Sequence, residues 1–215
     1  MSIEEALRTK LQGRTTGIDK FDRLWDAAVL LPLVYENGVP SILFEVRAAA
    51  LRRQPGEICF PGGKKECSDA TLAATAVRET CEELGLQSSD ITLLGELDAL
   101  VTHAGPIIHP FVGVLPSGIT YNYNPAEVEC LFTVPLKWLL ACEPRVGYVQ
   151  LADKPREDFP FDLVPLRQRN WRYHKEYKVY FYPYGDKVIW GLTARMLHAF
   201  LENYRELLSS NLELK

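Results

Sequence analysis

The sequence lacks the features that assign a chain to several common classes of protein. It has no apolar run approaching the ~18 residues of a membrane-spanning helix, and its first residues, MSIEEALRTK, contain acidic side chains and no apolar core. Such a start is typical neither of a secretory signal nor of an Arg-rich mitochondrial presequence. Basic residues are not in excess, since the formal net charge is −4, which argues against a general nucleic-acid-binding protein. We therefore expect a cytoplasmic protein with no membrane and no nucleic acid among its partners.

The cysteines lack a pairing pattern as well. The five cysteines are odd in number and include no Cys-x-x-Cys pair, so neither a disulfide framework nor a zinc site of the usual spacing is expected. Cys81 lies within a run of acidic residues, and neighbouring carboxylates raise the pKa of a thiol. We expect Cys81 to be a packing residue and not a nucleophile.

The remaining composition is that of an ordinary globular protein. With 215 residues, 47% hydrophobic and 24% charged, the chain suits one domain spanning residues 1–215.

A hairpin is predicted at residues 27–48, turning at Glu36-Asn37-Gly38. A helix is predicted at about residues 69–84, capped by Ser68 or Asp69 and ended by Gly85. Strands interrupted by helices predict an α/β fold with a mixed sheet between helical layers.

Further elements follow the same patterns. Ser2 and Glu5 form a capping box that predicts a short amphipathic helix. A long C-terminal helix at about residues 192–208 carries an apolar stripe that suits either the protein core or a homodimer interface. The sequence assigns no structure to residues 143–175. The other predicted elements are strands at residues 91–100, 107–115 and 130–134, a short helix at 136–140 and a hairpin at 178–190.

The helix at residues 69–84 carries three glutamates within five positions, Glu79, Glu82 and Glu83. Residues three and four apart are neighbours on a helix, so these carboxylates repel one another. Divalent cations bound through carboxylate oxygens would turn that repulsion into attraction. A solvated acidic stripe explains the glutamates, but it explains neither the glycine turn before the helix nor the adjacent Arg78. The sequence therefore predicts a metal site.

This stretch resembles a known signature. Residues 63–86 resemble the Nudix box of hydrolases that cleave a nucleoside diphosphate linked to another group. The first half departs from the usual pattern, because Asp69 stands where Glu is usual and eight residues rather than seven follow it. The resemblance implies the Nudix fold, an α/β/α sandwich with a central mixed sheet. The second half of the box matches at Arg78, Glu79, Thr80, Glu82, Glu83, Gly85 and Leu86.

The longer spacing resembles the coenzyme A pyrophosphatase branch of the Nudix family, which has a second signature upstream. Residues 43–63 read LFEVRAAALRRQPGEICFPGG and keep the spacing of that signature at Arg47, Arg52 and Gly56. Only Ala48 departs, standing where Ser is usual. Together the motifs cover about 40 residues with many fixed positions, so chance agreement is improbable. The resemblance implies hydrolysis of coenzyme A or a derivative to 4′-phosphopantetheine and adenosine 3′,5′-bisphosphate, with Mg²⁺ or Mn²⁺.

Chemistry and resemblance together indicate the metal ligands. Divalent ions neutralise the charge of a pyrophosphate, polarise a phosphorus–oxygen bond and activate water. Glu79, Glu82 and Glu83 are therefore candidate ligands, and the uncrowded carbonyl of Gly63 can add one more. Arg78 is expected to hold a glutamate in position, although a simple i to i+4 salt bridge with Glu82 also accounts for it.

The base that deprotonates the attacking water is left open by the sequence. For the two loop residues among the candidates a solvated loop is an equal alternative. His103 and His109 are less favoured, because a lone histidine is more often a surface or core residue. The four candidates are Glu79 and Glu83 of the helix and Glu127 and Glu129 of the loop that begins at Asn124.

Substrate binding requires cations for the phosphates. Arg47 and Arg52 are predicted to bind them, because a guanidinium suits bidentate phosphate contacts. Gly62 and Gly63, at the end of the same motif, are also expected to contact the substrate through their backbone. The segment at residues 167–175 mixes cations with aromatic side chains and can stack an adenine or simply cover the core. We prefer the interpretation that this segment only covers the core.

Two other functions stay open. ADP-ribose, NADH, a dinucleoside polyphosphate or a modified nucleoside triphosphate would be cleaved by the same chemistry. A Nudix-like module without catalysis would only bind a nucleotide, but such modules typically lose box glutamates, and all three are present here.

Overall fold

The computed structural model describes residues 2–12, 25–103, 105–165 and 170–213, and most of them surround one mixed sheet. Strands β1 and β7 at its centre run parallel, and the other pairs in this sheet are antiparallel. The strands are β1 (Asp26–Glu36), β2 (Val39–Arg47), β3 (Ile58–Cys59), β4 (Gly62–Lys64), β5 (Thr92–Glu96), β6 (Leu100–Val101), β7 (Ile107–Val114) and β8 (Val128–Pro135).

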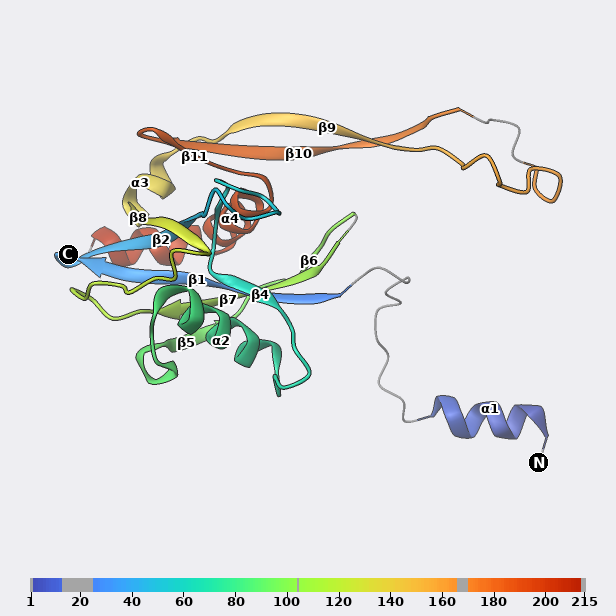
Figure 1. Cartoon of the computed structure of the whole chain (residues 1–215), viewed down its shortest axis with the longest axis horizontal. Helices are drawn as coiled ribbons and strands as arrows, with labels where there is room; N and C mark the ends of the chain where they lie inside the picture. Colours follow the sequence, from blue (N-terminus) through green and yellow to red (C-terminus); the bar gives the residue numbers. More distant parts are fainter. Residues whose placement is uncertain (1, 13–24, 104, 166–169, 214–215) are drawn as a thin grey trace.

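Helices cover both faces of this sheet. Helix α2 (Leu72–Leu84) lies on one face, while α3 (Leu136–Ala141) and α4 (Gly191–Glu213) lie on the other (Figure 1). Each face has its own apolar cluster, one beneath α2 and one beneath α3 and α4. A 3-10 turn, η2 (Ser88–Asp90), follows α2. The predicted α/β/α sandwich with a mixed central sheet is confirmed.

The β1–β2 hairpin forms where the sequence predicts it. Asn37 and Gly38 have φ angles of 49° and 80°, as a two-residue turn between right-twisted strands requires. Side chains alternate between the faces of a strand. In β2 this places Leu43 in the cluster beneath α2, while Phe44 and Val46 join the opposite cluster.

A second, three-stranded antiparallel sheet lies outside the sandwich. It consists of β9 (Arg145–Asp153), β10 (Arg172–Tyr184) and β11 (Lys187–Trp190), and it lies on the side of α4 that faces away from the main sheet (Figure 1). Tyr182 and Ile189 of this sheet are buried in the same cluster as Leu197 of α4. The stretch that the sequence left unassigned therefore supplies all of β9 and the start of β10.

The two terminal helices behave differently. Helix α1 (Ile3–Leu11) has the predicted capping box, with Ser2 Oγ accepting from Glu5 N at 3.1 Å, but it buries no residue and stands apart from the sheet (Figure 1). In α4 the apolar stripe packs within its own chain, with Leu197 and Leu201 fully buried. That stripe therefore gives no separate argument for a homodimer. No helix among the described residues is long and apolar enough to cross a membrane.

Candidate active site

Helix α2 presents the acidic residues, and it begins later than the sequence predicted. Thr71 is the N-cap, and its side chain accepts a hydrogen bond from Ala74 N. The predicted caps Ser68 and Asp69 are wrong, because the Asp69 carboxylate is already engaged by Glu66 N, the Thr75 hydroxyl and Arg78. The C-terminal prediction is confirmed, since Gly85 adopts the left-handed conformation with φ 68°.

The three glutamates of α2 differ in burial. Glu82 is exposed, with 59% of its side chain accessible, and the carboxylate of Glu79 is mostly covered. Glu83 is buried, at 4% exposure. Its burial is supported by the backbone amide of Gly62, which donates to Glu83 Oε2 at 2.9 Å.

Arg78 joins several of these carboxylates. Its Nε donates to Asp69 Oδ1 at 3.0 Å, and its Nη2 donates to Glu79 Oε1 at 2.9 Å. The predicted i to i+4 bridge is also present, with Nη1 donating to Glu82 Oε2 at 3.2 Å. The hydrogen bond from Arg78 holds the pKa of Asp69 well below its usual range. Arg78 is therefore fixed by three anions at once, and Asp69 is a partner that the sequence did not predict.

The two glycines of the turn allow backbone and carboxylate to approach closely. At Gly62 the φ angle is 152°, and a Cβ would lie 2.4 Å from the carbonyl oxygen of Ala28. A Cβ on Gly63 would instead lie 2.4 Å from the carboxylate of Glu79. Strand β4 thus brings the backbone of Gly63 directly against the Glu79 carboxylate.

These contacts predict different outcomes for two similar substitutions. Gly63→Ala is expected to displace only the flexible end of Glu79, which lowers activity roughly tenfold and leaves the melting temperature nearly unchanged. Gly62→Ala is expected to disturb the β1–β4 pairing itself, because its Cβ meets backbone atoms, so it lowers the melting temperature. Steady-state assays and thermal unfolding of both variants measure this. Equal losses of stability in the two would contradict the placement of Glu79 over Gly63.

A fourth carboxylate, Glu45 of β2, lies in the same cluster and was missed by the sequence interpretation. It is 1% exposed, and burial raises its pKa. Burial likewise raises the pKa of Glu83, and the charge of Glu45 raises it further. The one available signal was a charged residue inside the otherwise apolar run of β2.

Of the two predicted loop bases, only Glu127 joins the cluster. Its charge raises the pKa of Glu45, of Glu79 and of Glu83. Glu129 was predicted in a loop but lies on strand β8, where it is exposed. Within the described part of the chain, Glu129 makes no hydrogen bond or ion pair with α2.

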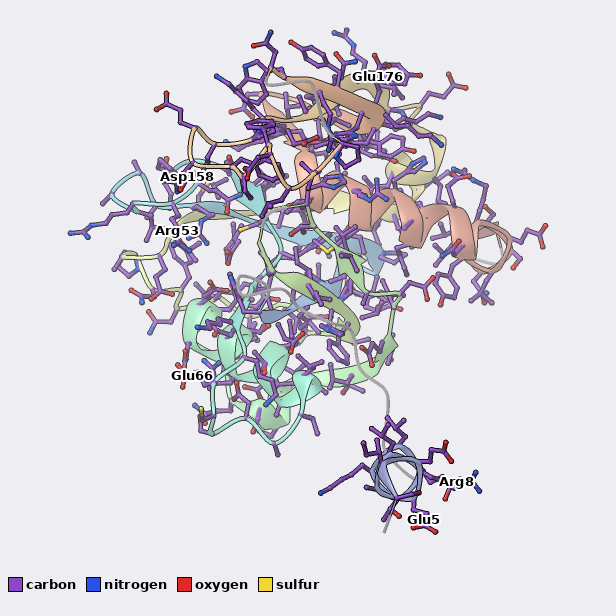
Figure 2. The ribbon with its side chains drawn as sticks, turned by 90° about the vertical axis from the view of Figure 1, so that its right-hand side faces the viewer. Glu5, Arg8, Arg53, Glu66, Asp158 and Glu176 are labelled. Carbon is purple, nitrogen blue, oxygen red and sulfur yellow. The ribbon has the colours of Figure 1, made fainter. Side chains whose placement is uncertain are left out.

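Besides Arg78, Arg47 also reaches this cluster. It ends β2, its charge lowers the pKa of Glu45, and its Nε is buried with no hydrogen-bond partner among the described residues. Arg52 lies in the loop that follows and is exposed. Its neighbour Arg53 is exposed as well and lies at the surface (Figure 2). The structure therefore brings Arg47 to the carboxylates and leaves Arg52 at the edge.

The two histidines considered as bases, and the basic aromatic segment, make contacts outside the carboxylate cluster. His109 lies on β7, with Nδ1 3.2 Å from Glu96 and Nε2 3.5 Å from Asp26. His103 stacks on Tyr177 with ring centroids 5.0 Å apart. In the basic aromatic segment, Arg167 and Arg169 fall outside the described residues, whereas Arg172 and His174 pair with Asp153.

The donor set fits a hard divalent cation. Within the described ranges, no three His, Cys, Asp or Glu side chains already form a closed ligand group. Mg²⁺ needs no such cage, because it binds through one or two carboxylates and keeps waters or substrate phosphate oxygens as its other ligands. One oxygen of Glu45 is buried and has no hydrogen-bond partner in the described part of the chain, which is the situation a bound cation relieves. Glu79, Glu83 and Glu45 are thus suited to hold such an ion.

A cavity of about 500 Å³ lies elsewhere, between β1, β2, β8 and the segment at residues 116–121. None of the clustered carboxylates lines it. The chemistry-bearing residues instead occupy the junction of α2, β2, β4 and the loop that contains Glu127. We place the candidate active site at this junction, because charge and unsatisfied polar atoms gather there and not in the cavity.

The chain is similar to known proteins over most of its length. Residues 25–144 match the NUDIX domain. An uncharacterized Nudix hydrolase, NudL of Photorhabdus laumondii, is 35% identical over 172 residues, or 80% of this chain and 81% of that protein. NudL of Yersinia enterocolitica is 32% identical over 175 residues, or 80% and 77%. A solved Nudix hydrolase from M. smegmatis, RenU, aligns with a TM-score of 0.45 at 21% identity, over 53% of this chain and 72% of that one.

Proposed function

This chain belongs to the Nudix hydrolase family, and from that premise we propose that it hydrolyses the pyrophosphate bond of coenzyme A or a derivative. The products are 4′-phosphopantetheine and adenosine 3′,5′-bisphosphate. The observation that carries the proposal is that buried carboxylates lie near the guanidinium of Arg47, whose Nε has no hydrogen-bond partner within the described ranges. Carboxylates suit a cation and the guanidinium suits a phosphate, so the junction has groups for both halves of a metal–pyrophosphate complex.

A bound divalent ion supplies charge neutralisation and an activated water in such a site. The chain's own residues hold and orient it. In our proposal Glu79, Glu82 and Glu83 and the carbonyl of Gly63 are ligands. Arg78 fixes the Glu79 carboxylate, and the backbone of Gly62 and Gly63 lies against the substrate.

Water attacks one phosphorus atom and loses its proton to a carboxylate, while the bridging phosphorus–oxygen bond breaks and the other phosphate leaves. Glu127 is our preferred proton acceptor, because it is less buried than Glu83 and still lies within the field of the cluster. Glu79 is the alternative from the helix. Glu129 keeps its predicted role only as a proposal, since its exposed position on β8 gives no contact with α2 among the described residues.

Support for coenzyme A comes from the loop at residues 48–56, which follows the upstream motif. Gly56 N donates to Arg47 O at 3.0 Å, and Arg47 N donates to Glu57 O at 2.9 Å, so the loop closes back on Arg47. Gly56 needs its φ of 71° for this closure. Ala48 N donates to Glu127 O at 2.8 Å. The residue that follows Arg47 is thus bonded to the backbone of the candidate base, while Arg52 is exposed in the loop. In our proposal Arg52 binds the 3′-phosphate of coenzyme A.

We expect the pure protein to cleave coenzyme A with Mg²⁺ or Mn²⁺ and to release the two products in equal amounts, as measured by chromatography. Dephospho-coenzyme A, which lacks the 3′-phosphate, is expected to be a poorer substrate. ADP-ribose, NADH and a dinucleoside polyphosphate complete the panel. No cleavage of coenzyme A beside rapid cleavage of one of these would reject the substrate and keep the Nudix chemistry.

The neighbouring arginines provide a matched control. Arg52→Gln is expected to raise KM for coenzyme A about tenfold, which is the loss of one charge-assisted contact, and to have little effect with dephospho-coenzyme A. Arg53→Gln, one residue further along the same exposed loop, is expected to change neither. If both variants lose affinity equally for both substrates, the loop acts only through general charge.

A further inference from the structure

The unexplained group in the site is Glu45. Side chains of β2 alternate between the faces of the sheet, so Glu45 points to the same side as Leu43 and Arg47, toward α2. Its carboxylate is buried to 1% exposure. An ionised carboxylate is costly to bury unless it is paired, and none of the metal ligands expected for the Nudix box lies on this strand.

The two oxygens of Glu45 are treated differently. Oε1 accepts a hydrogen bond from the Cys59 thiol at 3.0 Å, while Oε2 is buried with no partner among the described residues. A buried acceptor without a partner loses its hydration and gains nothing in return. The partner for Oε2 is therefore to be sought in a group that the described part of the chain does not provide.

Charged side chains from β2, α2 and the loop that contains Glu127 lie around Glu45. Arg47 contributes a positive charge from β2, while Glu83 of α2 and Glu127 of the following loop contribute negative ones. A bound cation would give Glu45 Oε2 the partner that the described residues do not supply. Carboxylate oxygens select hard cations such as Mg²⁺ and Mn²⁺.

We propose that Glu45 Oε2 and Glu83 together bind one divalent cation that stays with the enzyme between turnovers. This resident ion would be additional to any cation that Glu79 and Glu82 hold with the pyrophosphate. Cys59 keeps Oε1 occupied and so turns Oε2 toward the ion. The inference rests on the proposed function, because the resident ion serves the same cleft.

The test is Mn²⁺ binding to the full chain without any nucleotide, followed by electron paramagnetic resonance or calorimetry. The wild-type protein is expected to bind one Mn²⁺ more tightly than any others. Glu45→Gln is expected to weaken that site at least about tenfold, as loss of a ligand or its support does. Glu206→Gln, an exposed glutamate on α4, is expected to change nothing. Unchanged tight binding in Glu45→Gln would overturn the proposal.

A measurement on the wild-type protein covers the case in which the variant does not fold. Crystals soaked in Mn²⁺ are expected to show an anomalous peak bonded to Glu45 Oε2. A peak bonded only to α2 residues, or none, would mean that Glu45 and Glu83 share a proton instead, and the proposal would fall. Neither experiment uses coenzyme A, so tight Mn²⁺ binding without coenzyme A cleavage would reject the proposed substrate and keep the resident ion.

Discussion

Glu83→Gln is expected to lower turnover by about 100-fold or more while the fold stays intact. The substitution keeps the size of the side chain, and its amide oxygen can still accept from Gly62 N. It removes the negative charge that a cation requires. Ligand–metal interactions at a reacting phosphate are worth several kcal/mol, and each ~1.4 kcal/mol is a factor of ten in rate. A steady-state assay over a range of Mg²⁺ concentrations measures the loss.

The same variant is expected to be more stable than the wild type at high pH when metal is absent. Burial and the charge of Glu45 raise the pKa of Glu83 above the ordinary value of 4.5. A carboxyl with a raised pKa in the folded state stabilises the protein fully at low pH, and that stability is lost as the pH rises through the raised value. The metal-free wild type should therefore melt at lower temperature as the pH increases from about 5 to 9. Glu83→Gln should show a weaker dependence.

Two controls distinguish the loss of a metal ligand from the removal of any negative charge. Glu206→Gln removes an exposed glutamate of α4 and is expected to change neither activity nor the pH dependence of melting. Mn²⁺ added to the wild type should raise the melting temperature most at high pH, because an ion that binds only the folded state stabilises it. If Glu83→Gln keeps activity within about threefold of the wild type, the metal assignment is wrong.

The fold was accessible from the sequence wherever local signals decide the structure. The Asn37-Gly38 turn specifies its own hairpin, and the pattern of small and apolar residues in α2 specifies its packed face. The hairpin predicted at residues 178–190 is present as the end of β10 and β11, but β9 and the start of β10 gave no such signal. They pair over a long separation in sequence, their register shifts between Tyr173 and Glu176, and their exposed positions do not alternate cleanly. These strands form because they pair with each other, and their own sequence pattern does not identify them.

Residues of the candidate site could likewise be predicted only where spacing along the sequence identifies them. Residues close together in the sequence, such as Arg78, Glu79 and Gly63, were identified from spacing. Glu45 was missed because its neighbours Glu83 and Cys59 come from α2 and β3, and only the folded sheet brings them together. Asp69 was assigned to the helix cap because the sequence does not show that an arginine nine residues later reaches its carboxylate.

Arg78→Met is expected to lower activity by about 10–100-fold, the usual cost of removing a group that orients a metal ligand. Methionine keeps the apolar stem and removes the guanidinium that holds Asp69, Glu79 and Glu82. Without it the Glu79 carboxylate is free to leave Gly63, so the metal concentration for half-maximal activity should rise. Arg78→Lys should recover little, because an ammonium group cannot form the same forked contacts.

A purely structural salt bridge makes a different prediction. An exposed i to i+4 pair between Arg78 and Glu82 is worth only about 0.2–0.5 kcal/mol, which changes a rate by about twofold at most. Arg205→Met offers the matched case, because Arg205 pairs with Glu202 on the surface of α4 and should cost activity nothing. If Arg78→Met behaves like Arg205→Met and leaves the metal requirement unchanged, Arg78 only stabilises its helix. A rise in the metal requirement that is confined to Arg78→Met would show that the three-way contact serves the ion.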